Sequence, residues 1–91
     1  MITNSQKEFF LVRDDTDITK LFHRWESVVS FLTDDIMRYG YHIIPQDEEN
    51  RFTAPKDREE CFNVLNDVKS LTDLNALLED LWYIELIEFS D

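Results

Sequence analysis

A chain of 91 residues with 20 acidic and 9 basic side chains carries a net charge of −11. This length accommodates one domain, so we expect a single acidic globular domain over residues 1–91. The negative charge argues against direct binding to nucleic acid or to anionic lipid, and the 43% hydrophobic fraction argues against intrinsic disorder.

Cysteine usage and the lack of long apolar runs predict a cytoplasmic protein. Cys61 is the single cysteine, so it has no partner for a disulfide within the chain. The first thirty residues lack the basic start and apolar run of a signal peptide, and no run of about eighteen apolar residues is present to span a bilayer. We expect Cys61 to be a small buried hydrophobe on a helix.

Residues 7–13, KEFFLVR, predict a short strand because they are rich in aromatic and β-branched side chains. A long amphipathic helix is predicted over residues 17–39, where apolar side chains recur at steps of three and four. This stripe consists of Ile18, Leu21, Phe22, Trp25, Val28, Val29, Leu32, Ile36 and Tyr39. We expect Asp15, Thr16 and Asp17 to cap the first turn and Gly40 to end the helix. Phe31 and Met37 lie off the stripe, and their exposure would favour a homodimer.

The second half of the chain predicts two shorter helices. The first covers about residues 55–69 and is started by Thr53 and Pro55, and the second covers about residues 72–82 and is capped by Thr72. Before them, YHIIP fits a small strand or an extended crossover, and residues 51–53 fit a partner strand, although no Asn-Gly or Asp-Gly turn favours a tight hairpin. The final segment, WYIELIEF, fits both a strand and a helix, and we favour a strand at 83–89 paired with residues 7–13. The predicted fold class is therefore a helix-dominated α+β domain with a small sheet from the terminal segments, and an all-α fold is the alternative.

No motif for catalysis, cofactor binding or metal binding is present. His23 and His42 lack the i, i+4 spacing of metal-binding histidines, and the clusters 15–17 and 47–49 lack the glycine and the glutamate of a calcium-binding loop. There is no G-x-S-x-G sequence, and a single glycine does not build a phosphate-binding loop. We therefore predict a protein that is not an enzyme and needs no cofactor.

The last quarter of the chain is the most acidic part, because residues 70–91 contain six acids and no base. Carboxylates three or four residues apart on a helix are about 5–6 Å from one another, a spacing that can imitate a nucleic-acid backbone. Aromatic side chains anchor many interfaces, and two of them lie among these acids. The predicted partner-binding set is Asp47, Glu48, Glu49, Asp80, Trp82, Tyr83, Glu85 and Glu88.

In size, charge and lack of catalytic motifs the chain resembles phage anti-restriction and anti-CRISPR proteins, and bacterial immunity proteins that neutralise nuclease toxins. The resemblance implies a non-enzymatic inhibitor that occupies the basic active site or nucleic-acid channel of a nuclease or another nucleic-acid-binding protein by mimicking nucleic acid. It matches no family residue by residue, so no site is carried over from it.

Two other classes remain open. One is a structural or adaptor subunit that uses an apolar surface. The other is a phosphopantetheine carrier modified at Ser70, although Lys69 stands where such carriers hold aspartate.

Overall fold

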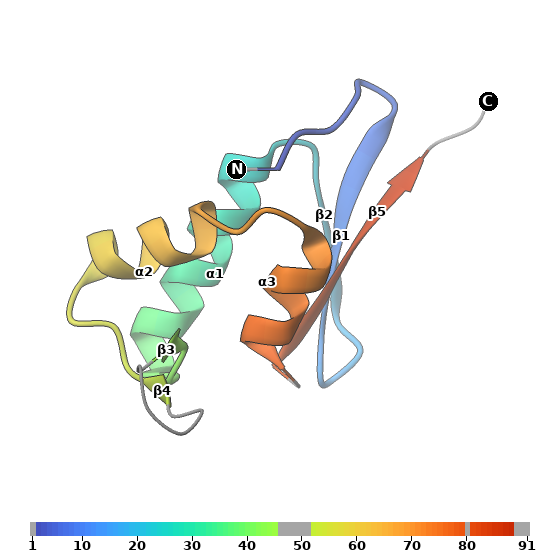
Figure 1. Cartoon of the computed structure of the whole chain (residues 1–91). Coiled ribbons are helices and arrows are strands. Elements are labelled where there is room, and N and C mark those ends of the chain that lie inside the picture. The colour runs from blue at the N-terminus through green and yellow to red at the C-terminus, as the bar shows by residue number, and fades with distance from the viewer. Residues whose placement is uncertain (1, 46–51, 80, 89–91) are drawn as a thin grey trace.

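The computed structural model describes residues 2–45, 52–79 and 81–88 (Figure 1). Within these ranges the chain forms three helices and five strands, in a mixed α+β fold. In chain order they are β1 (Glu8–Asp14), β2 (Thr19–Phe22), α1 (Trp25–Tyr39), β3 (Ile44–Pro45), β4 (Phe52–Thr53), α2 (Arg58–Asn66), α3 (Leu71–Leu78) and β5 (Trp82–Glu88).

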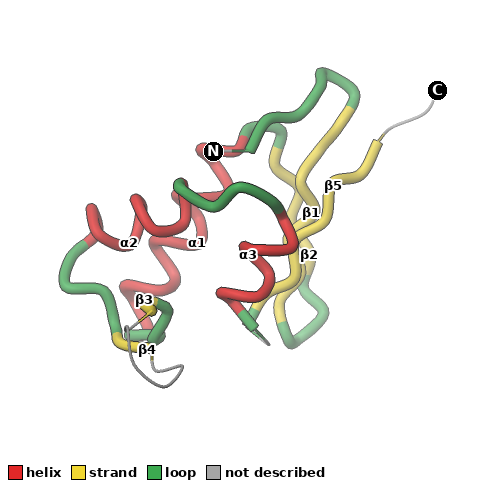
Figure 2. Tube along the Cα trace, viewed as in Figure 1, coloured by secondary structure: helices red, strands yellow, loops and turns green. Residues whose placement is uncertain are grey.

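The main sheet has three antiparallel strands in the order β2-β1-β5, and β3 and β4 form a separate small hairpin. The three helices lie on one side of the main sheet, with α1 beside α2 and α3 against β5 (Figures 1 and 2). The long axis of the molecule measures 47 Å and the two shorter axes measure 26 and 22 Å. The helices and the sheet therefore form two layers.

The core fills the space between these layers. Strand side chains alternate between the two faces of a sheet, so Phe10, Val12 and Ile84 all point toward the helices and are buried. The helices contribute Val28, Val29, Leu32 and Ile36 from α1, Cys61 and Leu65 from α2, and Leu74 and Leu78 from α3. Burying each of the larger side chains contributes about 1.5–3 kcal/mol. The prediction that Cys61 is buried is confirmed.

The prediction of a helix-dominated fold is wrong, because the long helix begins eight residues later than expected. Residues 19–22 form β2, which pairs with β1, and α1 starts at Trp25. The apolar residues Ile18, Leu21 and Phe22 fit a helical stripe, but a four-residue strand tolerates them as well. Pairing with β1 satisfies the backbone of this segment and overrides the local helical pattern. Gly40 ends α1 in the left-handed conformation, as expected (φ 70°).

Phe31 and Met37 are also placed differently from the prediction. Both are partly buried and pack against the core. The ring of Phe31 contacts that of Phe22, with the centroids 5.3 Å apart, and the Lys20 ammonium group lies 4.8 Å from the Phe31 centroid. Because both side chains pack against the core, they give no reason to expect a homodimer.

The two shorter helices are present, but both are shorter than predicted. Asp57 caps α2 through a carboxylate oxygen that accepts the Glu60 N–H (2.8 Å), and Ser70 caps α3 by accepting the Asp73 N–H (3.1 Å). The helices therefore begin after these caps, not at Pro55 and Thr72. α3 ends at Leu78, and Trp82, the predicted end of this helix, belongs to β5.

The pairing of the two terminal segments confirms a prediction. β1 and β5 run antiparallel, from Glu8 opposite Glu88 to Asp14 opposite Trp82. The small pair formed by β3 and β4 also lies where the sequence indicated it. Residue 89, the predicted end of the last strand, lies outside the described residues.

One side chain of α3 closes part of the open edge of β5. The Asn75 side-chain amide donates to the Ile84 carbonyl oxygen and accepts from the Ile84 N–H, both at 2.8 Å. These are the two bonds that a neighbouring strand would make to this residue. Asn75 thereby ties α3 to the sheet and removes an open position from its edge.

We predict that Asn75→Ala lowers the free energy of unfolding by about 1–3 kcal/mol, because it leaves a partly buried N–H and C=O without partners. Asn63→Ala is the control, since Asn63 is exposed on α2 and its side chain has no such role. Urea denaturation of both variants measures the difference. Equal stability of the two variants would contradict this role for Asn75.

Candidate protein-binding surface

The turn between β1 and β2 brings several carboxylates to one end of the sheet. One Asp14 carboxylate oxygen accepts the Thr16 hydroxyl (2.7 Å) and the backbone N–H groups of Thr16 (2.9 Å) and Ile18 (3.1 Å). These bonds, the hydroxyl first, lower the pKa of Asp14 below its ordinary value of 3.8, so it stays charged at neutral pH. The expected role of residues 15–17 as helix caps is therefore wrong, because they form this turn and α1 has Arg24 at its N-cap position.

The register of the sheet places this turn beside the start of β5, since Asp14 is opposite Trp82. Trp82 faces the helices and is buried. The Tyr41 ring meets the Trp82 ring edge-on, with the ring centroids 5.5 Å apart. The Tyr39 ring packs against the Tyr41 ring, with the centroids 5.8 Å apart. An aromatic cluster therefore lies next to the carboxylates of the turn.

Two adjoining cavities are formed where these groups meet. The first has a volume of about 370 Å³ and is lined by Arg13, Asp14, Asp15, Glu79, Trp82 and Tyr83. The second has a volume of about 220 Å³ and is lined by Asp14, Asp15, Asp35, Tyr39, Tyr41, Leu81 and Trp82. Three residues are common to both cavities, so the two form one continuous surface. We call this surface the acidic–aromatic end and define it by Asp14, Asp15, Asp35, Glu79, Tyr39, Tyr41, Trp82 and Tyr83.

The charge of this surface is strongly negative. Four carboxylates line the two cavities, and among the described lining residues Arg13 is the one base. The Arg13 guanidinium group already forms an ion pair with Glu85 at 2.7 Å. The Arg13 guanidinium group therefore does not neutralise the carboxylates of the acidic–aromatic end.

Two tyrosines supply exposed aromatic surface at the same place. Tyr39 is 62% exposed and Tyr83 is 53% exposed, although large apolar side chains are more often covered. The Arg13 guanidinium carbon lies 5.9 Å from the centroid of the Tyr83 ring. Aromatic faces attract cations, so both rings suit contact with arginine or lysine side chains.

Glu79 is held in an unfavourable backbone conformation. Its φ of 51° and ψ of −119° follow the last turn of α3, and glycine is the residue that adopts a positive φ without steric cost. Retaining a residue with a side chain here costs about 1–3 kcal/mol. Backbone strain of this kind is typical of functional positions. Here the strained residue, Glu79, lines the larger cavity with its carboxylate.

The predicted partner-binding set is only partly assembled by the structure. Asp47, Glu48, Glu49 and Asp80 lie outside the described residues. Trp82 and Tyr83 both line the larger cavity, where Trp82 is buried and Tyr83 is exposed. The two aromatic residues are thus brought together with acids, as the hypothesis required, but with different acids from those expected.

The two remaining predicted acids lie farther along β5 and on opposite faces of the sheet. Glu85 is on the face away from the helices, where it pairs with Arg13. Glu88 is exposed at the end of the strand, opposite Glu8. Neither residue lines the two cavities of the acidic–aromatic end.

Six residues of this surface lie outside the predicted partner-binding set: Asp14, Asp15, Asp35, Glu79, Tyr39 and Tyr41. A usable signal was present, since an antiparallel pairing of residues 7–13 with 83–89 places the end of the first strand beside the start of the last one. Asp14 and Asp15 follow the first strand directly. The positions of Asp35 and Tyr39 could not be predicted in this way, because the periodicity of α1 does not show which face of the helix lies beside the β1–β2 turn.

Other candidate groups have structural roles. The Ser70 hydroxyl caps α3, which is the role expected of a helix-start serine without any modification. Burial raises the pKa of the Cys61 thiol above 9.0, so it is not a reactive thiolate at neutral pH. In the described ranges no three His, Cys, Asp or Glu side chains are grouped to hold a metal ion. None of the described helices is long and apolar enough to cross a membrane.

Comparisons with protein-family models, with curated proteins and with solved structures give no match.

We predict that Glu79→Gly raises the free energy of unfolding by about 1 kcal/mol, because glycine relieves the positive φ. Glu79→Gln is the matched control, because it removes the same charge but keeps a side chain in the positive-φ conformation, and we expect it to leave the free energy of unfolding nearly unchanged. Thermal unfolding measures the stability of both variants. A loss of stability in Glu79→Gly would contradict the strain.

Proposed function

We propose that the protein is a non-enzymatic cytoplasmic inhibitor whose acidic–aromatic end binds a basic protein. The target is a nuclease or another nucleic-acid-binding protein, and the inhibitor blocks the site that would otherwise hold nucleic acid. The chain resembles anti-restriction, anti-CRISPR and toxin-immunity proteins in size and charge, and this resemblance implies such a mode of action.

The observation that supports this proposal best is the combination of four carboxylates with exposed tyrosines around two joined cavities. Asp14, Asp15, Asp35 and Glu79 offer acceptors for arginine and lysine side chains. The net charge of −11 attracts a basic target over a distance and speeds its association. Tyr39 and Tyr83 supply the apolar contact that long-range charge does not provide.

The shape of the surface fits inhibition better than catalysis. A binding site for a protein needs exposed anchors and a wide, shallow area, and the two tyrosines flank two adjoining cavities of modest size. Carboxylates that stand where phosphates would stand make the same contacts with guanidinium groups. In the target's binding site the positions of the nucleic-acid phosphates are therefore taken by the carboxylates of Asp14, Asp15, Asp35 and Glu79.

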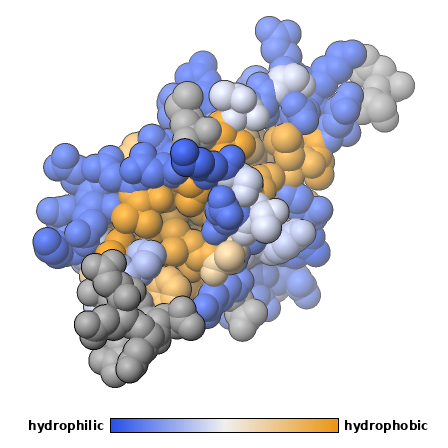
Figure 3. Space-filling model, in the orientation of Figure 1, coloured by the Kyte–Doolittle hydropathy of each residue, from blue (hydrophilic) through white to orange (hydrophobic). Residues whose placement is uncertain are grey.

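A second candidate is an adaptor subunit that binds through apolar surface. Figure 3 shows apolar side chains gathered between α2 and α3, with hydrophilic residues around them. A cavity of about 220 Å³ is found near this region, lined by His42, Phe52, Leu77, Leu78, Glu79 and Leu81. A partner of this kind would be neutral and its binding would resist salt.

The test is capture of binding partners from the native cytoplasm at low and high salt by the tagged protein and two double variants. Asp15→Lys with Glu79→Lys reverses two charges of the acidic–aromatic end. We expect binding at least about tenfold weaker, because the target's bases then face lysines. Quantitative mass spectrometry of the captured proteins measures the effect.

Glu59→Lys with Asp67→Lys is the matched control, because it changes the net charge equally at an exposed position of α2 and at the exposed residue that follows this helix. We expect this variant to keep most of its binding to the basic target. Equal loss in both double variants would show that only the overall charge matters. Capture of a neutral partner that resists high salt would favour the adaptor.

A further inference from the structure

The edge of β5 is closed by Asn75 at Ile84 and is open farther along, at Leu86 and Glu88. Backbone groups of alternate residues point to the same side of a strand. Since Ile84 directs its N–H and C=O away from β1 toward Asn75, Leu86 and Glu88 direct theirs to the same side. Asn75 reaches Ile84 alone, and no described residue bonds to the outward groups of Leu86 and Glu88.

The surroundings of this open segment leave room for another strand. α3 lies against the first part of β5, while the end of the strand extends past the helices with β1 on its other side (Figure 1). β5 also lacks the lysines and prolines that block many edge strands, as its sequence is WYIELIE. Among the described residues, the edge of β5 is therefore paired at Ile84 and unpaired at Leu86 and Glu88.

We propose that the edge of β5 at Leu86 and Glu88 binds an extended segment of a basic partner protein, which adds a fourth strand to the sheet. The partner's main chain bonds to the outward N–H and C=O groups of these two residues. This surface lies at the opposite end of β5 from the acidic–aromatic end, so the inference holds with or without the proposed function.

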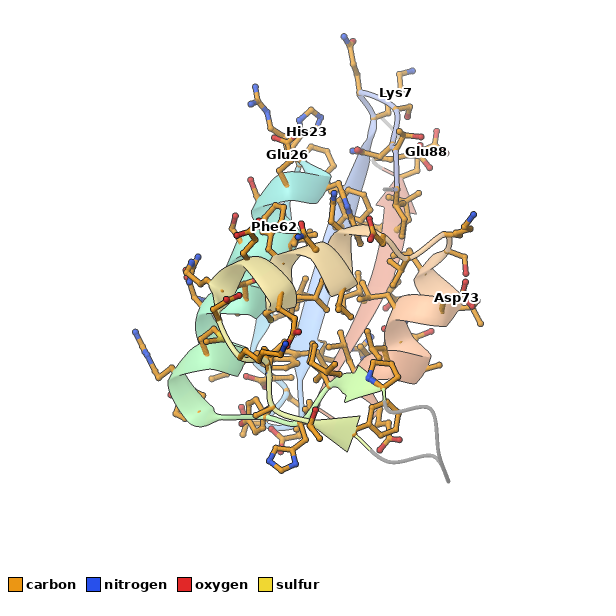
Figure 4. The ribbon with its side chains drawn as sticks, turned by 60° about the vertical axis from the view of Figure 1, so that its left-hand side comes forward. Lys7, His23, Glu26, Phe62, Asp73 and Glu88 are labelled. Atoms are coloured by element: carbon orange, nitrogen blue, oxygen red, sulfur yellow. The ribbon has the colours of Figure 1, made fainter. Side chains whose placement is uncertain are left out.

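Charge indicates that the added strand is basic. Glu8 and Glu88 are opposite each other in the register, and like charges at such positions are unfavourable. Figure 4 shows Glu88 at the end of β5, at the same end of the sheet as Lys7. Residues 70–91 contain no base. A lysine or arginine on the added strand would relieve the repulsion between the two glutamates.

A second copy of the chain fits this edge less well. Antiparallel pairing of β5 with itself around Ile87 would place Leu86 of one copy opposite Glu88 of the other, and it would bring the two acidic strands together. Each copy carries a charge of −11, and neither offers a base from its last 22 residues. Repulsion therefore favours a basic partner over self-association.

The probe is a peptide of alternating lysine and valine with an acetylated N-terminus and an amidated C-terminus. NMR measures the amide hydrogen-exchange rates of the full chain with and without this peptide. We expect saturating peptide to slow exchange of the Leu86 and Glu88 amides by at least about tenfold, because each becomes hydrogen-bonded. The same peptide with N-methyl groups on the amides that face the protein keeps its charge and is expected to give no protection.

Two variants separate the main chain from the charge at the same position. Glu88→Pro removes an outward N–H that β1 does not use, so the fold tolerates it and peptide binding weakens by about tenfold. Glu88→Gln retains the N–H and weakens binding by only about threefold. Far-ultraviolet circular dichroism verifies that both variants are folded.

Three results would overturn the inference. The first is protection that is confined to the acidic–aromatic end. The second is equal binding of the methylated peptide, which would show that charge alone attracts it. The third is protection of Leu86 and Glu88 by self-association in the absence of peptide.

Discussion

The pairing of β1 with β5 is the contact on which the rest of the structure depends. It joins segments far apart in the chain, as the ion pair between Arg13 and Glu85 spans 72 positions. Closing so long a loop has an entropic cost, which the buried faces of both strands offset through Phe10, Val12 and Ile84. The same register puts the β1–β2 turn beside Trp82, so one set of strand contacts forms both the core and the acidic–aromatic end.

Much of the fold could be predicted from the sequence where a local pattern had one reading. The stripe from Val28 to Ile36 and the glycine that ends α1 are of this kind. The last strand was also predicted correctly, although its segment fitted a helix as well. The segment 18–22 had two readings, because Ile18, Leu21 and Phe22 fit a helical face as well as a short strand. Only the presence of β1 as a partner decides between them, and that information is not local. The helix-dominated class failed for this reason.

The types of residue in the candidate site could be predicted from the sequence, but most of the particular residues could not. Composition indicated acids next to aromatic anchors, and Trp82 and Tyr83 do lie beside carboxylates. The particular acids depended on the register of β1 against β5 and on the rotation of α1, which brings Asp35 and Tyr39 to the same end. Glu85 shows the limit of charge counting, since it forms an ion pair with Arg13 of the neighbouring strand. The strain at Glu79 is invisible in the sequence.

The central claim is that the acidic–aromatic end contacts a basic protein. Photo-crosslinking in the native cytoplasm tests it most directly, with a benzoylphenylalanine at Tyr83 in one variant and at the exposed Asn63 of α2 in another. The account predicts a crosslinked product with a basic nucleic-acid-handling protein from position 83 and none from position 63. A product from position 63 alone, or a neutral protein linked at position 83, would contradict it.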